Sequence, residues 1–214
     1  DDDEAVETGL AGRTSASGLR ERGAARNHSR RAGGLAHFCV IGRDVEMSEE
    51  IFDVVNERDE VIGRYTRAEV HRLGLQQRAI HVLVFNARGE IFLQKRSMKK
   101  DCFPGAWDSS AAGHLDCGED YGACAVRELR EELGFTPPLP PRRLFKLSAM
   151  PETGMEHVWV YQCEAEGPFT LHPEEIEDGG WFSRERVTQW INERPQDFAS
   201  ALIVIWRKFL ELQT

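Results

Sequence analysis

From about residue 50 onward, apolar and polar residues alternate with the periods expected of strands and helices. The runs IFDVVN and VIGRYT flank a polar turn and predict a β-hairpin over 51–66. Thr66 then predicts the N-cap of a short helix, RAEVHRLGL. A second hairpin is predicted from AIHVLVF (79–85) and EIFLQKR (90–96), which the turn NARG separates.

Further along, the segment 97–112 predicts a loop with Pro104-Gly105 as its turn. The acidic segment 120–133 predicts a helix that stops at Gly134. The remaining patterns predict the strands RLFKLSAM and HVWVYQCEA, a strand end and helix in WFSRERVTQWIN with Ser183 as N-cap, and an amphipathic helix around 196–212. Strands and helices mixed in this way, without a repeat, predict one α/β domain of about 165 residues.

Residues 1–46 lack this pattern and are rich in Gly, Ala, Arg and Ser. Such a segment buries too little apolar surface to offset the entropy lost on ordering. Its opening DDDE argues against a transit peptide, and Met47 directly precedes the patterned region. We therefore expect 1–48 to be a disordered or mis-assigned N-terminal extension, and 49–212 to be the domain.

The composition excludes several classes of function. A formal net charge of −9 argues against a nucleic-acid surface, which requires a basic stripe. The run ALIVIW near the C-terminus is too short to span a membrane and is typical of a core helix. The five cysteines contain no C-x-x-C, which predicts reduced thiols in a cytoplasmic protein rather than a disulfide framework or a zinc site.

The helix predicted at 120–133 carries an unusual cluster of negative charge. Its apolar stripe is predicted to consist of Gly122, Val126, Leu129 and Leu133. Its acids Glu128, Glu131 and Glu132 fall together on another face, where like charges repel one another. A solvated surface in which Arg127 pairs with Glu131 is one explanation, but it leaves two further acids with little compensation. A bound divalent cation such as Mg²⁺ explains the cluster better, because Mg²⁺ prefers carboxylate oxygen.

The spacing of this segment carries a resemblance to a known family. Gly113, Glu119 and the run RELREELGF (127–135) match every position of the Nudix box, G-x5-E-x7-R-E-U-x-E-E-x-G-U. The chain thus resembles the Nudix hydrolases. The resemblance implies an α/β/α sandwich with a mixed β-sheet and a catalytic loop-helix-loop. It also implies Mg²⁺ or Mn²⁺ as cofactor, a small-molecule diphosphate as substrate, and a homodimer as an open possibility.

Carried over by position, the resemblance implies roles for individual residues of the box. Glu128 and Glu132 are expected to be the principal metal ligands, and Glu131 a third ligand or the base that activates water. The carbonyl of Gly113 is expected to complete the metal shell. Glu119 is expected to pair with Arg127 and orient the helix.

Other candidates lie outside the box. Families of this kind recruit an acid from a later loop, and Glu175 is the candidate here, with Glu174 and Glu177 equally available. Lys95 and Arg96, at the end of a predicted strand, are candidate phosphate contacts, as is His114. Alternatively, the two basic residues form an ordinary strand end and His114 packs. Trp107 is expected to pack in the core or loop rather than to stack on a base.

The segment QKRSMKKDCFPGAWDSSAAGH resembles the isopentenyl-diphosphate-isomerase-like branch of the family. The isomerases carry a Cys that takes part in proton transfer, and here that position is Ala112, although Cys117 and Cys124 lie nearby. We therefore expect a hydrolase that cleaves the diphosphate of a nucleoside diphosphate linked to another moiety. The alternatives are the isomerase and a non-catalytic nucleotide-sensing module. Loops at 97–112, 136–142 and 165–180 are expected to select that moiety.

Overall fold

The computed structural model describes residues 50–213, and these begin with the first predicted hairpin. Strands β1 (Ile51–Val55) and β2 (Val61–Thr66) pair antiparallel. Thr66 caps helix α1 (Arg67–Leu73), because its hydroxyl accepts a bond from the backbone N–H of Glu69 while the Glu69 carboxylate accepts one from the N–H of Thr66. The hairpin and its capped helix are confirmed.

Seven further strands form one mixed sheet, in the order β5-β4-β3-β8-β7, with β6 paired to β3 and β9 paired to β4. Strands β3 and β8 run parallel, and the other pairs are antiparallel. The strands are β3 (Gln77–Phe85), β4 (Ile91–Arg96), β5 (Trp107–Asp108), β6 (Ala111–His114), β7 (Arg142–Leu147), β8 (Glu156–Glu164) and β9 (Ile176–Phe182).

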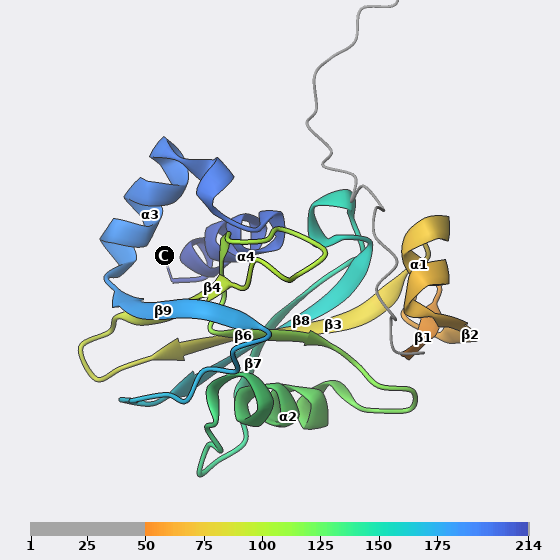
Figure 1. Ribbon diagram of the computed structural model, residues 1–214, viewed down its shortest axis with the longest axis horizontal. Helices are drawn as coiled ribbons and strands as arrows, with labels where there is room; N and C mark the ends of the chain where they lie inside the picture. The colour runs from red at the N-terminus through yellow and green to blue at the C-terminus, as the bar shows by residue number, and fades with distance from the viewer. Residues whose placement is uncertain (1–49, 214) are drawn as a thin grey trace, which may run out of the picture. The chain divides into compact units, whose positions relative to one another are not determined.

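Helices cover both faces of this sheet (Figure 1). Helix α2 (Tyr121–Leu133) packs on one face, and α3 (Arg184–Glu193) and α4 (Ser200–Glu211) pack on the other. Short 3₁₀ turns lie at Pro151–Thr153 and Pro195–Asp197. The predicted α/β/α sandwich with a mixed sheet is confirmed, and ALIVIW lies in the core helix α4 as expected.

The prediction of an unbroken loop over 97–112 is wrong at its end, where β5 and β6 form. Ser109 and Ser110, which lie between these two strands, are polar and therefore suggested an exposed loop. In the structure both are fully buried. The Ser110 hydroxyl donates to the carbonyl of Phe92 (2.5 Å) and accepts from the N–H of Val84 (2.8 Å). Internal partners of this kind let serine occupy a sheet interior.

The predicted apolar stripe of α2 is also partly wrong. Gly122 and Val126 remain partly exposed, whereas two of the acids, Glu128 and Glu132, are buried. The buried face consists of Tyr121, Cys124, Ala125, Glu128, Leu129, Glu132 and Leu133. The helix packs on β6, whose sequence AAGH offers small side chains, so a wider face is covered than the leucine spacing indicates.

Two further predictions concern the rest of the chain. The expectation of five reduced thiols is wrong for Cys102, which is disulfide-bonded, whereas Cys117, Cys124 and Cys163 are free. The extension expected at 1–48 lies outside the described residues. Across 50–213, no helix is long and apolar enough to cross a membrane.

Asp59 ties the first hairpin to the sheet and to α2. This turn residue has a φ of 63°, and its carboxylate accepts bonds from Arg78 of β3, Lys146 of β7 and the hydroxyl of Tyr121, the last at 2.9 Å. Burial alone would raise the pKa of Asp59, but the hydrogen bonds from Lys146, Arg78 and Tyr121 outweigh it and lower the pKa. The carboxylate therefore stabilises the fold in its charged form.

Asp59→Asn is expected to lower the free energy of unfolding by about 2 kcal/mol at pH 7, because it leaves two half-buried cations without their anion. Asparagine tolerates the left-handed backbone, so backbone strain adds little. The folded pKa lies below the ordinary value of 3.8, so the deficit should be complete above that pH and shrink as pH falls below it. Urea unfolding at several pH values measures this, with exposed Glu57→Gln of the same turn as control. An equal deficit at pH 3 and pH 7 would contradict the assignment.

Candidate active site

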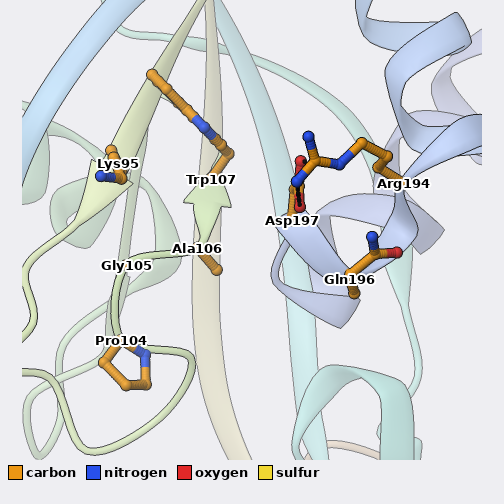
Figure 2. A pocket seen from close by; sticks show the side chains of 8 residues that line it. All are labelled: Lys95, Pro104, Gly105, Ala106, Trp107, Arg194, Gln196 and Asp197. Carbon is orange, nitrogen blue, oxygen red and sulfur yellow. Dashed lines mark hydrogen bonds and ion pairs between the residues drawn. The ribbon is translucent and has the colours of Figure 1, made fainter.

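A polar hollow of about 310 Å³ lies where β4 ends (Figure 2). Its lining comes from the end of β4, from the segment leading into β5, and from the 3₁₀ turn after α3. The lining residues are Lys95, Pro104, Gly105, Ala106, Trp107, Arg194, Gln196 and Asp197. The Trp107 ring contacts Phe182 and Trp190 edge-on. Trp107 is thus a packing residue, as expected.

The hollow lies on the side of β4 opposite to α2. Neighbouring residues of a strand face opposite sides of the sheet. Gln94 faces α2, since its amide donates to the Glu132 carboxylate at 3.0 Å, whereas Lys95 lines the hollow and contacts Glu177 at 3.5 Å. The structure therefore does not bring the predicted phosphate contact Lys95 together with the acids of α2.

The other two predicted phosphate contacts have internal partners. Arg96 donates to the carboxylate of Asp108 (3.1 Å) and to the carbonyl of Cys102 (3.1 Å). His114 Nε2 lies 2.8 Å from the carboxylate of Glu156, and its ring contacts Phe52. Both side chains are already engaged, so a phosphate would have to share or replace these partners.

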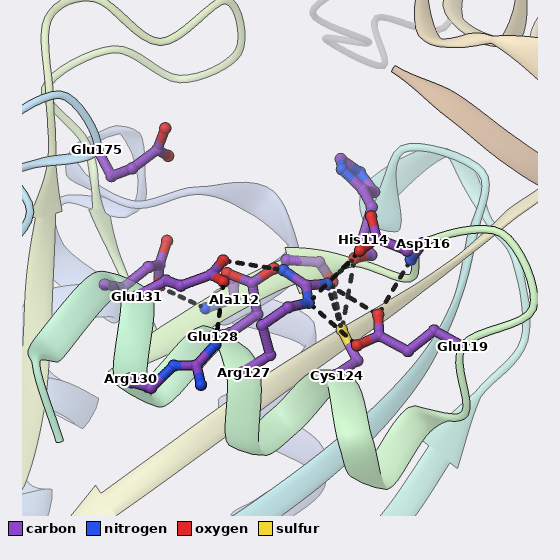
Figure 3. A network of polar contacts seen from close by, with 12 residues as sticks. Ala112, His114, Asp116, Glu119, Cys124, Arg127, Glu128, Arg130, Glu131 and Glu175 are labelled. Atoms are coloured by element: carbon purple, nitrogen blue, oxygen red, sulfur yellow. Dashed lines mark hydrogen bonds and ion pairs between the residues drawn. The ribbon is translucent and has the colours of Figure 1, made fainter. Parts of the chain in front are cut away.

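Gly113 on β6 makes room for Glu128, which Figure 3 shows on α2. A methyl group added to Gly113 would lie 2.0 Å from Glu128 Oε1 and 2.1 Å from its Cδ, far inside contact distance. The Glu128 side chain therefore occupies the volume that any larger residue would fill. Two positions of the Nudix box thus depend on each other, because Glu128 can take this place only if residue 113 is glycine.

Glu132 is buried one helical turn further along the same face of α2. One carboxylate oxygen accepts bonds from the backbone N–H of Ala112 and from the amide of Gln94, both at 3.0 Å. Both donors are electrically neutral, so they orient the carboxylate without neutralising it.

Burial makes both carboxylates costly to ionise. Loss of hydration raises the pKa of Glu128, and the neighbouring Arg127 offsets this only in part. Burial also raises the pKa of Glu132, and the charge of Glu128 raises it further. The two groups together form a desolvated pair of carboxyl groups whose charged forms a bound cation would stabilise.

Arg127 holds the entry to α2 in place. Its guanidinium makes a two-pronged contact with Glu119, at 3.0 and 2.9 Å, as predicted. It also donates to the carbonyl of His114 (2.9 Å), to Glu128 (2.7 Å) and to the exposed Glu131 (3.1 Å). One side chain thereby connects the loop before the helix, strand β6 and the acids.

Two backbone bonds bring the loop before β9 to the C-terminal end of α2. The N–H of Thr170 donates to the carbonyl of Leu133, and that of His172 donates to the carbonyl of Glu132, each at 2.9 Å. Glu175 follows on this loop and stands apart from the Arg127 network (Figure 3). Its carboxylate pairs with Lys100 instead.

Sequence reasoning missed three residues that contact candidate site residues: Gln94 contacts Glu132, Lys100 contacts Glu175, and Glu156 contacts His114. Gln94 had a detectable signal, since it is a polar residue at a core-facing position of an apolar strand. Lys100 and Glu156 had none, because each acts on a partner that is distant in the sequence.

Comparisons with known proteins agree with this geometry. The sequence matches the family described as NUDIX domain over residues 75–202. It is 34% identical over 156 residues to an uncharacterized Nudix hydrolase of Yersinia pestis. The aligned region covers 72% of this chain and 84% of that protein. It is also 30% identical over 162 residues to an isopentenyl-diphosphate Delta-isomerase of Serratia proteamaculans. That aligned region covers 74% of this chain and 90% of that protein.

A solved structure shares the arrangement of strands and helices. The crystal structure of DR0079 from Deinococcus radiodurans is similar with a TM-score of 0.68 and 30% identity, over 74% of this chain and 98% of that one. The family match alone covers more than half of the chain, and it includes the complete box and the helix that carries it. The chain therefore belongs to the Nudix hydrolase family, enzymes that act on phosphoric anhydride bonds.

Proposed function

We propose that this chain is a divalent-metal-dependent hydrolase that cleaves the diphosphate of a nucleoside diphosphate linked to another moiety. The observation that carries the proposal is the buried pair Glu128 and Glu132, which lies on a helix braced by Arg127 and Glu119. Burying two acids side by side costs free energy, and a bound cation would recover it.

The donor set fits Mg²⁺ or Mn²⁺. Within residues 50–213, no three carboxylate, imidazole or thiol groups converge as a closed metal site. Mg²⁺ does not need such a cage, since it is held by one or two carboxylates together with water and substrate phosphate. Glu128, Glu132 and the carbonyl of Gly113 would hold the ion. Such an ion would polarise the phosphoryl oxygens and lower the pKa of bound water.

The remaining acids are candidates for handling the proton of water. Glu131 is about half exposed, so it can exchange a proton with solvent, and Arg127 keeps it beside the buried pair. Glu175, on the loop bound to the end of α2, is the alternative base. Glu174, Glu175 and Glu177 each pair with a lysine, but Glu175 is the one of the three whose charge acts on Glu132, so it is the later-loop acid best placed for this role.

A substrate panel tests the activity. Purified protein with Mg²⁺ or Mn²⁺ is incubated with nucleoside di- and triphosphates, nucleotide sugars and dinucleotides, and products are separated by chromatography. Release of a nucleoside monophosphate or phosphate that stops on chelation is the expected result. Binding of a nucleotide with no product from any substrate would favour the sensing module instead.

The isomerase alternative lacks a proton donor at the expected position. Ala112 has only a methyl side chain, and its backbone N–H bonds to Glu132. The nearby Cys124 thiol is fully buried, and burial raises its pKa. Isopentenyl diphosphate incubated in deuterated water should therefore gain no label in carbon.

Finer predictions about the cellular setting belong to the same proposal. A cytoplasmic location is part of the same proposal, and the free thiols of Cys117, Cys124 and Cys163 are in keeping with it. A small-molecule substrate and the absence of nucleic-acid binding rest on the family and on the net charge of −9. Homodimer formation can be measured by light scattering of the purified chain.

Arg127→Lys is expected to lower kcat/KM about 10- to 100-fold, because lysine cannot reproduce the fork that joins Glu119, β6 and Glu128. The matched control is Arg130→Lys on the same helix, where the side chain is 65% exposed and its one ion pair within residues 50–213 is a 3.6 Å contact to Glu131. Steady-state kinetics with the substrate found in the panel measure both. Equal activity of the two variants would contradict the bracing role of Arg127.

A further inference from the structure

Each of the two buried acids of α2 has one carboxylate oxygen that accepts hydrogen bonds and one that does not. Oε1 of Glu128 accepts a bond from the guanidinium of Arg127 at 2.7 Å. Oε2 of Glu132 accepts bonds from the amide of Gln94 and from the N–H of Ala112, both at 3.0 Å. Within residues 50–213, no donor bonds to the second oxygen of either acid, so each acid keeps one free oxygen.

These two free oxygens are open to solvent. In the part of the chain that the structure describes, the fully buried side-chain N and O atoms without a partner belong to Arg67 and Gln77. Oε1 of Glu132 and Oε2 of Glu128 are not among them, although the two residues are only 5% and 9% exposed. The small exposed area of each acid therefore includes its free oxygen, which a cation can reach.

Gln94 is fixed in the sheet, and its amide can take only one orientation. Strand β4 is paired on both sides at this residue, with Asp108 of β5 and with Gly179 of β9. Turning the amide round would place its oxygen against the Glu132 carboxylate, and two acceptors repel each other. The amide N–H therefore faces Glu132, and it is held there by a residue that is 1% exposed.

We propose that Gln94 is a positioning residue, which keeps Glu132 turned so that it binds the divalent ion through its free oxygen alone. Without the amide, the N–H of Ala112 is the one remaining donor to this carboxylate within residues 50–213, and the carboxylate can rotate about its last bond. The inference rests on the proposed function, because it concerns the same ion. A glutamine that merely fills the sheet interior would have no effect on metal affinity.

Calorimetric titration of the full chain with Mn²⁺, in the absence of substrate, tests the inference. Gln94→Met keeps a side chain of similar length but removes the donor, and it should weaken Mn²⁺ binding about tenfold. Gln77→Met is the matched control, because Gln77 is also 1% exposed and lies on the adjacent β3, but its amide donates to Glu156 at 3.3 Å. This variant should bind Mn²⁺ like the wild type. Circular dichroism of both metal-free variants checks that they are folded.

A second measurement needs no variant. In a wild-type crystal soaked in Mn²⁺, the Gln94 amide should still bond to Glu132, and the ion should lie at the other carboxylate oxygen. Contact of the ion with both oxygens of Glu132, wild-type affinity in Gln94→Met, or an equal loss of affinity in Gln77→Met would overturn the inference while leaving the proposed function intact. A wild type that binds no Mn²⁺ would overturn both.

Discussion

Glu132→Gln is expected to lower kcat/KM by roughly 10²- to 10³-fold while leaving the protein as stable as the wild type or more so. The amide oxygen of glutamine can still accept the bonds from Ala112 and Gln94, so the local structure should persist. The substitution removes a carboxyl group whose ionisation is opposed by burial and by the charge of Glu128, so the fold loses no favourable charge. Activity falls because a carboxylate that would hold the divalent ion is lost.

Kinetics and thermal unfolding of the same preparation separate these two effects. Glu174→Gln is the activity control, because its carboxylate is exposed and pairs only with Lys99 among the contacts within residues 50–213. It should keep wild-type kcat/KM. Full activity in Glu132→Gln would show that the Glu132 carboxylate is not needed for catalysis. A large drop in the melting temperature would show that the carboxylate serves the fold instead.

Gly113→Ala is expected to lower activity about 10²-fold, because its methyl group would occupy the position of the Glu128 carboxylate. The backbone of Gly113 is not in the left-handed region, so the effect comes from this collision rather than from strain. The carboxylate must move by more than an ångström. Overpacking at this contact should also cost about 1–3 kcal/mol of stability.

Gly122→Ala provides the matched control on α2. Its added methyl group would lie 3.2 Å from Asp120 Oδ1 and touch no acid of the buried pair, and alanine favours the helix. This variant should keep its activity. Urea unfolding and kinetics measure both glycine variants. Wild-type activity in Gly113→Ala would mean that Glu128 is free to reposition and that its observed place is not required.

Local signals in the sequence account for much of the fold. Asp120 at the N-cap and Gly134 in the left-handed C-cap conformation delimit α2, and both are recognisable from residue type. Thr66 and Ser183 mark the starts of α1 and α3 in the same way. These elements were predictable because their boundaries depend on neighbours within a few residues.

Features that depend on distant residues were not predictable. The burial of Glu128 follows from the missing side chain of Gly113 on another element. Strand β6 was concealed by serines whose hydroxyls find partners on β3 and β4. The box spacing identified the acids, but the contacts that orient them, such as Gln94 on Glu132, arise only when the sheet assembles.

The central claim is that Glu128 and Glu132 together hold a divalent ion. A crystal soaked in Mn²⁺ and measured at the manganese absorption edge tests it directly, since the anomalous signal locates the ion without reference to activity. The account predicts a peak on the β6 side of α2, within bonding distance of a carboxylate oxygen of each residue. A peak elsewhere, or none at millimolar Mn²⁺ with both side chains ordered, would contradict it.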